Sequence, residues 1–146
     1  MKAALSVLEP ELTLRGAERK VLGTVVIATI QGDIHDIGKT LVGTMLASSG
    51  FRVYDLGVDV PIVKLVATAR EVQADIVALS ALLTTTMVNQ RVAVQQLAGA
   101  GLRPAVKVMV GGAPVTRSWA QEIGADGYSE DAIGAVAVAR QLVGVH

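Results

Sequence analysis

Hydrophobic positions in this sequence form short continuous runs that alternate with longer amphipathic stretches. Residues 21–30 are rich in β-branched side chains without polar alternation, which predicts a strand covered on both faces, as in a parallel sheet. Residues 74–79 and 105–110 have the same character, whereas 52–56 and 126–128 are shorter strand candidates. The amphipathic stretches between these runs predict helices at residues 37–49, 62–72, 84–100, 116–123 and 131–143.

The strict alternation of strand and helix predicts an α/β fold. Right-handed crossovers would give a doubly wound, five-stranded parallel sheet with the flavodoxin-like (Rossmann-like) strand order 2-1-3-4-5. In that order the chain changes direction between strands 1 and 3, and ligands bind beyond the carboxyl ends of those strands. We therefore expect the functional site in the loops after Ile30 and Leu79. Residues 1–19 are interpreted as a leader or the remnant of an N-terminal cap, and 20–146 as one domain.

Composition narrows the classes of function. The 146 residues include 13 acidic and 13 basic side chains, so no long-range field favours nucleic acid or an anionic membrane surface. The absence of cysteine excludes disulfides, thiolate metal sites and cysteine nucleophiles. We expect no secretion signal or membrane span in the first residues, because their apolar run is short and is followed by charged residues. We therefore expect a cytoplasmic protein that binds neither nucleic acid nor membrane.

The loop after the first predicted strand comes close to a nucleotide-binding P-loop but departs from it in two ways. Gly32 and Gly38 precede Lys39 and Thr40, but five residues separate the two glycines where a P-loop has four. The residues between them also include two carboxylates, which would repel a polyphosphate. These departures argue against phosphate binding.

The pair Asp33 and His35 suits a metal ligand and its supporting carboxylate. A neutral imidazole binds a metal through one ring nitrogen, and a carboxylate that accepts a hydrogen bond from the other fixes the tautomer. A free zinc or iron ion would need further ligands, yet the other histidine is His146 at the chain end. One histidine suits a metal that carries its own equatorial ligands, as in a tetrapyrrole. The alternative is a hydrogen-bonded loop pair in which Asp33 caps the following helix.

The segment Asp33-Ile34-His35-Asp36-Ile37-Gly38 resembles the DxHxxG signature of cobalamin-binding domains. This resemblance implies a base-off corrinoid whose cobalt has His35 as its lower ligand in place of dimethylbenzimidazole. It also implies that all six residues contact the cofactor, whose displaced nucleotide tail lies along the first helix. Gly43, Ala47 and Ser48 on that helix are small, which fits either a tail channel or ordinary packing against the sheet.

Two further elements strengthen the resemblance. Ser80 and Leu82 are similar to the family's SxL element, and the resemblance assigns Ser80 as the hydroxyl partner of Asp33. It places two more sets of residues near the corrin or its tail. These are Thr84 and Thr85, which follow the SxL element, and Gly111, Gly112 and Tyr128 near the last two strands. Capping of the next helix is the alternative for Thr85 and Thr86, and a surface turn is the alternative for Tyr128.

The resemblance implies a cobalamin cofactor (methylcobalamin or another corrinoid) and a methyl-carrier role in which Asp33, His35 and Ser80 are the catalytic residues. The implied partners are a substrate:corrinoid methyltransferase, a methyl-acceptor methyltransferase and a reductive activator. The alternatives are the cobalamin subunit of an adenosylcobalamin-dependent mutase and a non-catalytic binding or sensing module. Methyl carriers of this family usually have an N-terminal helical bundle, and we expect the roughly 20 residues before the first strand to be too few to form one.

Overall fold

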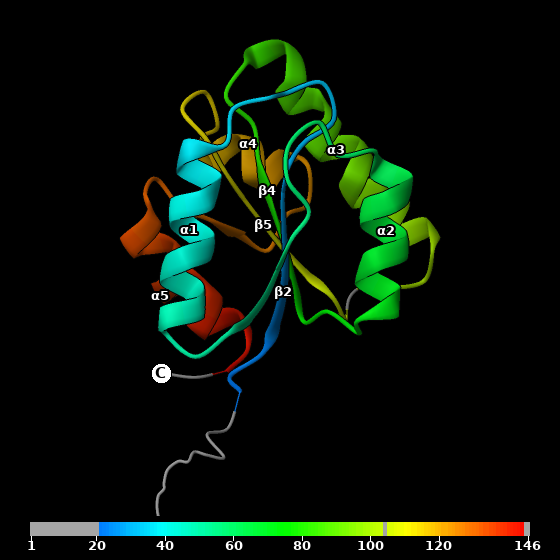
Figure 1. The fold of residues 1–146 in the computed structure, drawn as a ribbon. Helices are drawn as coiled ribbons and strands as arrows, with labels where there is room; N and C mark the ends of the chain where they lie inside the picture. Colours follow the sequence, from blue (N-terminus) through cyan, green and yellow to red (C-terminus); the bar gives the residue numbers. More distant parts are fainter. Residues whose placement is uncertain (1–20, 104, 145–146) are drawn as a thin grey trace, which may run out of the picture.

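The computed structural model describes residues 21–103 and 105–144, and its centre is a five-stranded sheet (Figure 1). All strand pairs are parallel, and the order across the sheet is β3-β2-β4-β5-β6. This is the predicted order 2-1-3-4-5. The strands are β2 (Thr24–Thr29), β3 (Arg52–Asp55), β4 (Ile76–Ser80), β5 (Lys107–Gly111) and β6 (Gly127–Tyr128). The proposed leader at residues 1–19 lies outside the described residues.

Helices cover both faces of the sheet, as the doubly wound prediction requires. One face packs against α1 (Ile37–Ser48) and α5 (Ala132–Leu142). The other packs against α2 (Ile62–Glu71), α3 (Thr84–Gly99) and α4 (Arg117–Glu122). None of the helices in the described part of the chain is long and apolar enough to cross a membrane.

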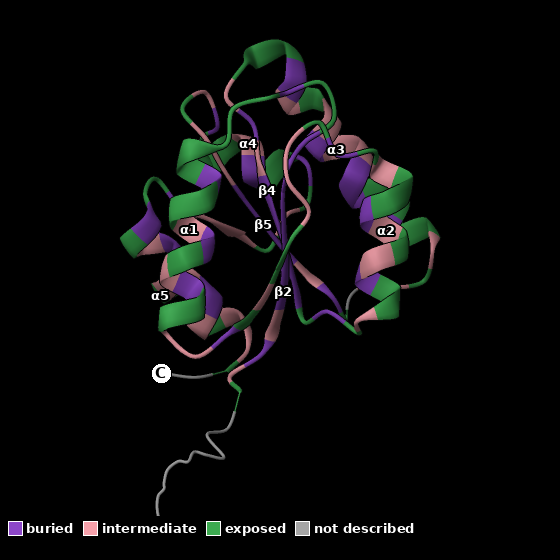
Figure 2. Ribbon diagram, in the orientation of Figure 1, coloured by how far each residue is buried: buried purple, intermediate pink, exposed green. Residues whose placement is uncertain are grey.

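The continuous apolar runs have a direct structural cause, because each strand contributes to two cores. Along β2, Val25 and Ile27 belong to the core beneath α1 and α5, whereas Val26 and Ala28 belong to the core beneath α2 and α3. Successive side chains of a strand point to opposite faces, so a strand covered on both sides has successive apolar positions, as β2 has at residues 25–28. Figure 2 shows the buried strands between helices whose outer surfaces are exposed.

The observed elements begin and end within a few residues of the predicted ones, and the differences at the last two helices arise from capping. The sequence pattern predicted that these helices start at Thr116 and Asp131. In the structure these two residues are the N-caps, and the helices begin one residue later. The Thr116 side chain accepts a hydrogen bond from the Trp119 backbone N–H at 3.0 Å. The Asp131 carboxylate accepts one from the Gly134 N–H at 2.7 Å. Such bonds satisfy backbone donors that the first helical turn leaves unpaired.

Candidate functional site

The histidine loop, residues 30–36, connects β2 to α1 at the carboxyl edge of the sheet. Its course is set by hydrogen bonds that involve its own backbone. The Asp33 N–H donates to the Ile30 carbonyl at 3.0 Å, and the Thr29 hydroxyl donates to the His35 carbonyl at 2.7 Å. Gly32 has a φ of +91°, in the left-handed region that favours glycine. The turn that carries His35 is therefore held by hydrogen bonds before it, at Asp33, and at the His35 carbonyl itself.

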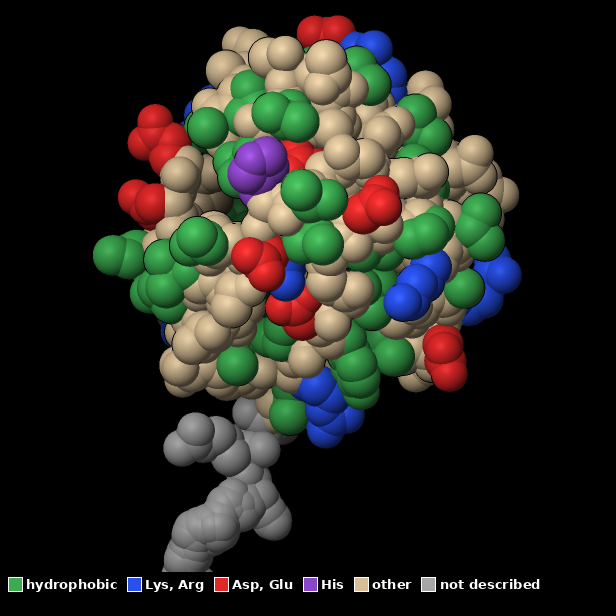
Figure 3. Space-filling view, turned by 45° about the horizontal axis from the view of Figure 1, so that its top comes forward, with side chains coloured by type: hydrophobic (Ala, Val, Ile, Leu, Met, Phe, Trp, Pro, Cys, Tyr) green, Lys and Arg blue, Asp and Glu red, His purple; other side chains and the backbone are tan. Residues whose placement is uncertain are grey.

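Asp33 and His35 form the hydrogen-bonded pair that the sequence predicted. The Nδ1 atom of His35 lies 2.7 Å from the Oδ1 atom of Asp33. The Asp33 side chain is completely buried, whereas 47% of the His35 side chain is exposed, and Figure 3 shows the histidine at the surface beside hydrophobic side chains. Because an ionised carboxylate only accepts hydrogen bonds, Nδ1 carries the proton and Nε2 is the nitrogen that can bind a metal.

The alternative in which Asp33 caps the first helix is wrong. The N-cap of α1 is Asp36, and no side chain caps that end of the helix. The Oδ1 atom of Asp33 instead accepts a second hydrogen bond from the His35 backbone N–H, at 3.1 Å. Asp33 therefore holds both the ring and the backbone of the histidine.

The hydroxyl partner of Asp33 is Thr86, which corrects the assignment of Ser80. The Oδ2 atom of Asp33 accepts hydrogen bonds from the Thr86 hydroxyl and from the Leu82 N–H, both at 2.7 Å. Ser80 is at the end of β4, where it shares a strand face with Ala78 and lines a cleft beneath α1 and α5. Thr86 lies in the first turn of α3, and that turn covers Asp33. The sequence signal was the threonine run itself, which did not reveal which hydroxyl points inward.

Burial and hydrogen bonding act in opposite directions on the pKa of the Asp33 carboxyl. Desolvation favours the neutral acid, but hydrogen bonds from the Leu82 N–H, the His35 ring and the Thr86 hydroxyl favour the anion. The hydrogen bonds prevail, and they hold this pKa well below its usual range. Asp33 is therefore a fixed negative charge beneath the imidazole.

Replacing Thr86 with valine is expected to lower the free energy of unfolding by about 1–3 kcal/mol, because a buried carboxylate loses a donor. The Thr86→Ser variant retains the hydroxyl and is expected to lose less. Ser80→Ala, which leaves Asp33 untouched, is the control. Urea denaturation followed by circular dichroism measures all three. A larger loss for Ser80→Ala than for Thr86→Val would contradict the assignment of Thr86.

Lys39 shows why the P-loop resemblance is only superficial. In a P-loop the equivalent lysine reaches toward phosphate, but here the Lys39 side chain is only 4% exposed. Its ammonium lies 2.7 and 2.8 Å from the two carboxylate oxygens of Asp55, at the end of β3. The lysine is thus already paired within the fold, where it connects the first turn of α1 to β3.

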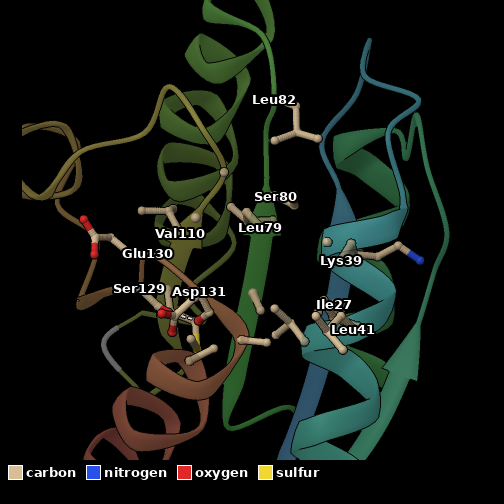
Figure 4. A pocket seen from close by; sticks show the side chains of 18 of the residues that line it. Ile27, Lys39, Leu41, Leu79, Ser80, Leu82, Val110, Ser129, Glu130 and Asp131 are labelled. Atoms are coloured by element: carbon tan, nitrogen blue, oxygen red, sulfur yellow. Dashed lines mark hydrogen bonds between the residues drawn. The ribbon is translucent and has the colours of Figure 1, made fainter.

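A cleft of about 370 Å³ lies next to the histidine loop, on the sheet face covered by α1 and α5 (Figure 4). Its floor includes Ile27, Ala78 and Met109, which are paired in register across β2, β4 and β5. Gly38, Leu41 and Val42 of α1 contribute one wall, and Ala132 and Ala135 of α5 contribute another. Ser80, Leu82, Gly111 and Gly112 also line the cleft. Its lining is therefore largely apolar and comes from segments distant in sequence.

The glycines singled out in the sequence have different roles. Gly38 lines the cleft, and a Cβ atom there would meet nothing within 4 Å. Gly43 is not among the residues that line the cleft. It faces the sheet, where a Cβ atom would make ordinary contacts with Ile27 at 3.7 Å and Val53 at 3.8 Å. Ala47 and Ser48 are exposed and are not among the residues that line the cleft.

The remaining predicted contact residues divide into two groups. Ile34, Asp36, Ile37, Thr84 and Thr85 are exposed around the ends of the two loops. Tyr128 is away from the cleft: it packs against the core beneath α2 and α3, and the Arg117 guanidinium lies 5.7 Å from the centroid of its ring. Tyr128 therefore contributes to packing, while its neighbour Ser129 lines the cleft.

These features fit a large, mostly apolar metal cofactor. Ile34 and Ile37 are 74% and 85% exposed on either side of His35, so apolar surface surrounds the one available imidazole nitrogen. Residues 21–103 and 105–144 contain no group of three or more acidic or histidine side chains that could hold a free ion. A tetrapyrrole-like ligand with a tail could use both the histidine and the adjoining cleft.

Comparison with known proteins agrees with this geometry. A model of the B12 binding domain matches residues 23–137. Dimethylamine corrinoid protein 2 of Methanosarcina acetivorans is 53% identical over 143 residues, which are 98% of this chain and 66% of that protein. The chain thus spans slightly less than two thirds of this relative's length.

Two solved structures share both the fold and substantial sequence identity. A cobalamin-binding protein from Desulfitobacterium hafniense DCB-2 has a TM-score of 0.81 and 43% identity over 84% of this chain and 60% of that one. The methanol:cobalamin methyltransferase complex MtaBC from Methanosarcina barkeri has a TM-score of 0.80 and 32% identity, covering 88% of this chain and 49% of the matched chain. This chain belongs to the B12-binding domain family, and its cofactor is cobalamin or a related corrinoid.

Proposed function

We propose that this chain is the corrinoid-carrying part of a methyltransferase system, with His35 as the lower cobalt ligand of a base-off corrinoid. The observation that carries the proposal is the His35 ring, held at Nδ1 by a buried carboxylate and placed beside an apolar cleft. Relatives named as methylamine corrinoid proteins favour methyl transfer over the isomerase alternative. The bound corrinoid would supply a cobalt centre that accepts and releases a methyl group.

The residues of this chain would orient the ligand and stabilise its charge. Asp33 holds the proton on Nδ1, which directs Nε2 outward as the metal-binding atom. Leu82, in the loop before α3, and Thr86, in the first turn of α3, hold the carboxylate in place. Because Asp33 is anionic, its hydrogen bond to Nδ1 would make Nε2 a stronger electron-pair donor toward a metal.

The cleft offers a site for the displaced nucleotide tail. It lies between two helices and is largely apolar, which suits an aromatic base. Ser80 and Ser129 add hydroxyl groups to its lining, and these suit the polar part of a nucleotide. In this proposal, Ser80 contacts the tail and does not belong to the hydrogen-bonded group of His35, Asp33 and Thr86.

The proposed partners are enzymes that deliver and remove the methyl group. A structural relative of this chain forms part of a methanol:cobalamin methyltransferase complex, which supports pairing with a substrate:corrinoid methyltransferase. A methyl-acceptor methyltransferase would complete the transfer. A reductive activator would return inactive, oxidised cobalt to its reduced state. The exposed Ile34 and Ile37 at the histidine loop place apolar surface where a cofactor or such partners could bind.

The proposal is tested by replacing His35 with alanine in the protein loaded with methylcobalamin or hydroxocobalamin. We expect the wild type to show the visible spectrum of a histidine-ligated corrinoid and His35→Ala to lose it while retaining corrinoid, because the cleft continues to hold the tail. Added imidazole is expected to restore nitrogen ligation in the variant. Gel filtration measures retention, and absorbance measures ligation.

Two results would contradict the proposal. A folded wild-type protein that retains no corrinoid would exclude the cofactor. Complete loss of corrinoid from a folded His35→Ala variant would contradict the part of the proposal in which the cleft holds the tail.

A further inference from the structure

Asp59 has an unusual backbone conformation at a position that the cofactor motifs do not include. Its φ is +49°, in the left-handed region that non-glycine residues rarely adopt. It lies in the segment that connects β3 to α2 and runs beside the histidine loop. Aspartate tolerates this conformation better than most residues, but the conformation still carries a cost. A strained residue persists where the surrounding structure requires it.

Among the described residues, Asp59 forms two hydrogen bonds, and both are to the histidine loop. Its Oδ1 atom accepts from the Gly32 N–H at 2.8 Å, and its backbone N–H donates to the Asp33 carbonyl at 2.8 Å. These two backbone groups lie on consecutive residues, immediately before the His35 turn. Asp59 therefore fixes the peptide units that place the Asp33 side chain beneath the imidazole.

The segment that carries Asp59 is itself anchored to the sheet. The Thr29 N–H donates to the Gly57 carbonyl at 2.9 Å, and the Val60 N–H donates to the Thr29 carbonyl at 3.2 Å. Val60 also forms a parallel bridge with Ile30. Because these bonds lie on both sides of Asp59 in the sequence, the residue acts on the loop from a rigid support.

We propose that Asp59 is a positioning residue that determines how strongly His35 ligates cobalt. The inference rests on the proposed function for the identity of the ligand. The two hydrogen bonds that Asp59 forms with Gly32 and Asp33, here called the brace, exist in the protein without its cofactor. A loop that is held in the ligating geometry loses less conformational entropy when His35 binds the metal. Loss of the two hydrogen bonds formed by Asp59 would weaken ligation of the metal by His35 without removing His35, Asp33 or Thr86.

Three substitutions in the full chain separate the hydrogen bond from the backbone conformation. Asp59→Asn retains an oxygen acceptor and a residue that tolerates positive φ. Asp59→Ala loses the acceptor and adds strain. Asp59→Gly loses the acceptor but relieves the strain. If the acceptor matters, alanine and glycine behave alike and asparagine resembles the wild type.

The first measurement uses the protein without cofactor. We expect hydrogen exchange of the Gly32 amide, followed by nuclear magnetic resonance, to accelerate about tenfold in Asp59→Ala and Asp59→Gly, because a charge-assisted bond is lost. The second uses methylcobalamin-loaded protein. We expect the ratio of histidine-ligated to unligated corrinoid, measured by absorbance, to fall about tenfold in the same two variants and by less than about twofold in Asp59→Asn.

Gln73 provides the matched control because its φ is also positive, at +55°, and it lies after α2. Gln73→Ala is expected to leave both measurements unchanged. Wild-type Gly32 exchange and wild-type ligation in Asp59→Gly would overturn the inference, as would an Asp59→Asn variant as impaired as Asp59→Ala. If the wild type binds no corrinoid, the proposed function fails while Gly32 exchange still tests the brace.

Discussion

Replacing Ala78 with phenylalanine is expected to weaken cobalamin binding by about a hundredfold, equivalent to about 2.8 kcal/mol. Binding of cobinamide, a corrinoid without a nucleotide tail, is expected to change by less than about twofold, well under 1 kcal/mol. Ala78 lies on the floor of the cleft between Ile27 and Met109. Its small side chain leaves the centre of that floor open. A phenyl ring there would occupy the volume proposed for the tail.

The difference between the two corrinoids separates this effect from general damage to the fold. Both ligands carry the same corrin ring and cobalt, and His35 is unchanged in the variant. Ala78→Ser serves as the matched control because it adds only one oxygen to the floor, so its cobalamin affinity is expected to remain near that of the wild type. Titration followed by absorbance measures the dissociation constants. Equal weakening for cobalamin and cobinamide would contradict placement of the tail in this cleft.

Replacing Gly112 with alanine is expected to lower the free energy of unfolding by about 3 kcal/mol or more. Gly112 has a φ of +126°, a conformation that residues with side chains rarely adopt. A Cβ atom there would lie 1.8 Å from the Ala81 carbonyl oxygen, so one of the two backbones would have to move. Because the Ala81 N–H donates to the Gly111 carbonyl at 3.1 Å, this movement would also disrupt the contact between the loops after β4 and β5.

The neighbouring glycine is the control for this prediction. Gly111 does not have a positive φ, and a Cβ atom there would lie 3.2 Å from the Ser129 carbonyl oxygen. Gly111→Ala is therefore expected to cost about 1 kcal/mol, within the usual range for small-to-large changes. Urea denaturation followed by circular dichroism measures both variants. A Gly112→Ala protein as stable as Gly111→Ala would show that the close approach to Ala81 is not required.

The sequence by itself determined the architecture and the centre of the site. Apolar runs without alternation predicted strands buried on both faces. The helical patterns between them predicted a parallel sheet with the strand order that the structure has. The spacing of Asp33 and His35 within one loop also predicted their contact, because residues two positions apart in a tight turn can meet. These properties depend on local periodicity and on short separations along the chain, which a sequence displays directly.

Only the tertiary structure decided the contacts between distant segments. The sequence analysis assigned Ser80 as the hydroxyl partner of Asp33, but the first turn of α3 lies over the histidine loop and brings Thr86 to the carboxylate instead. The pairing of Lys39 with Asp55 and the brace from Asp59 likewise depend on where β3 and its following segment pack. Such partners are chosen by the relative position of whole elements, and side-chain identity alone does not specify that position.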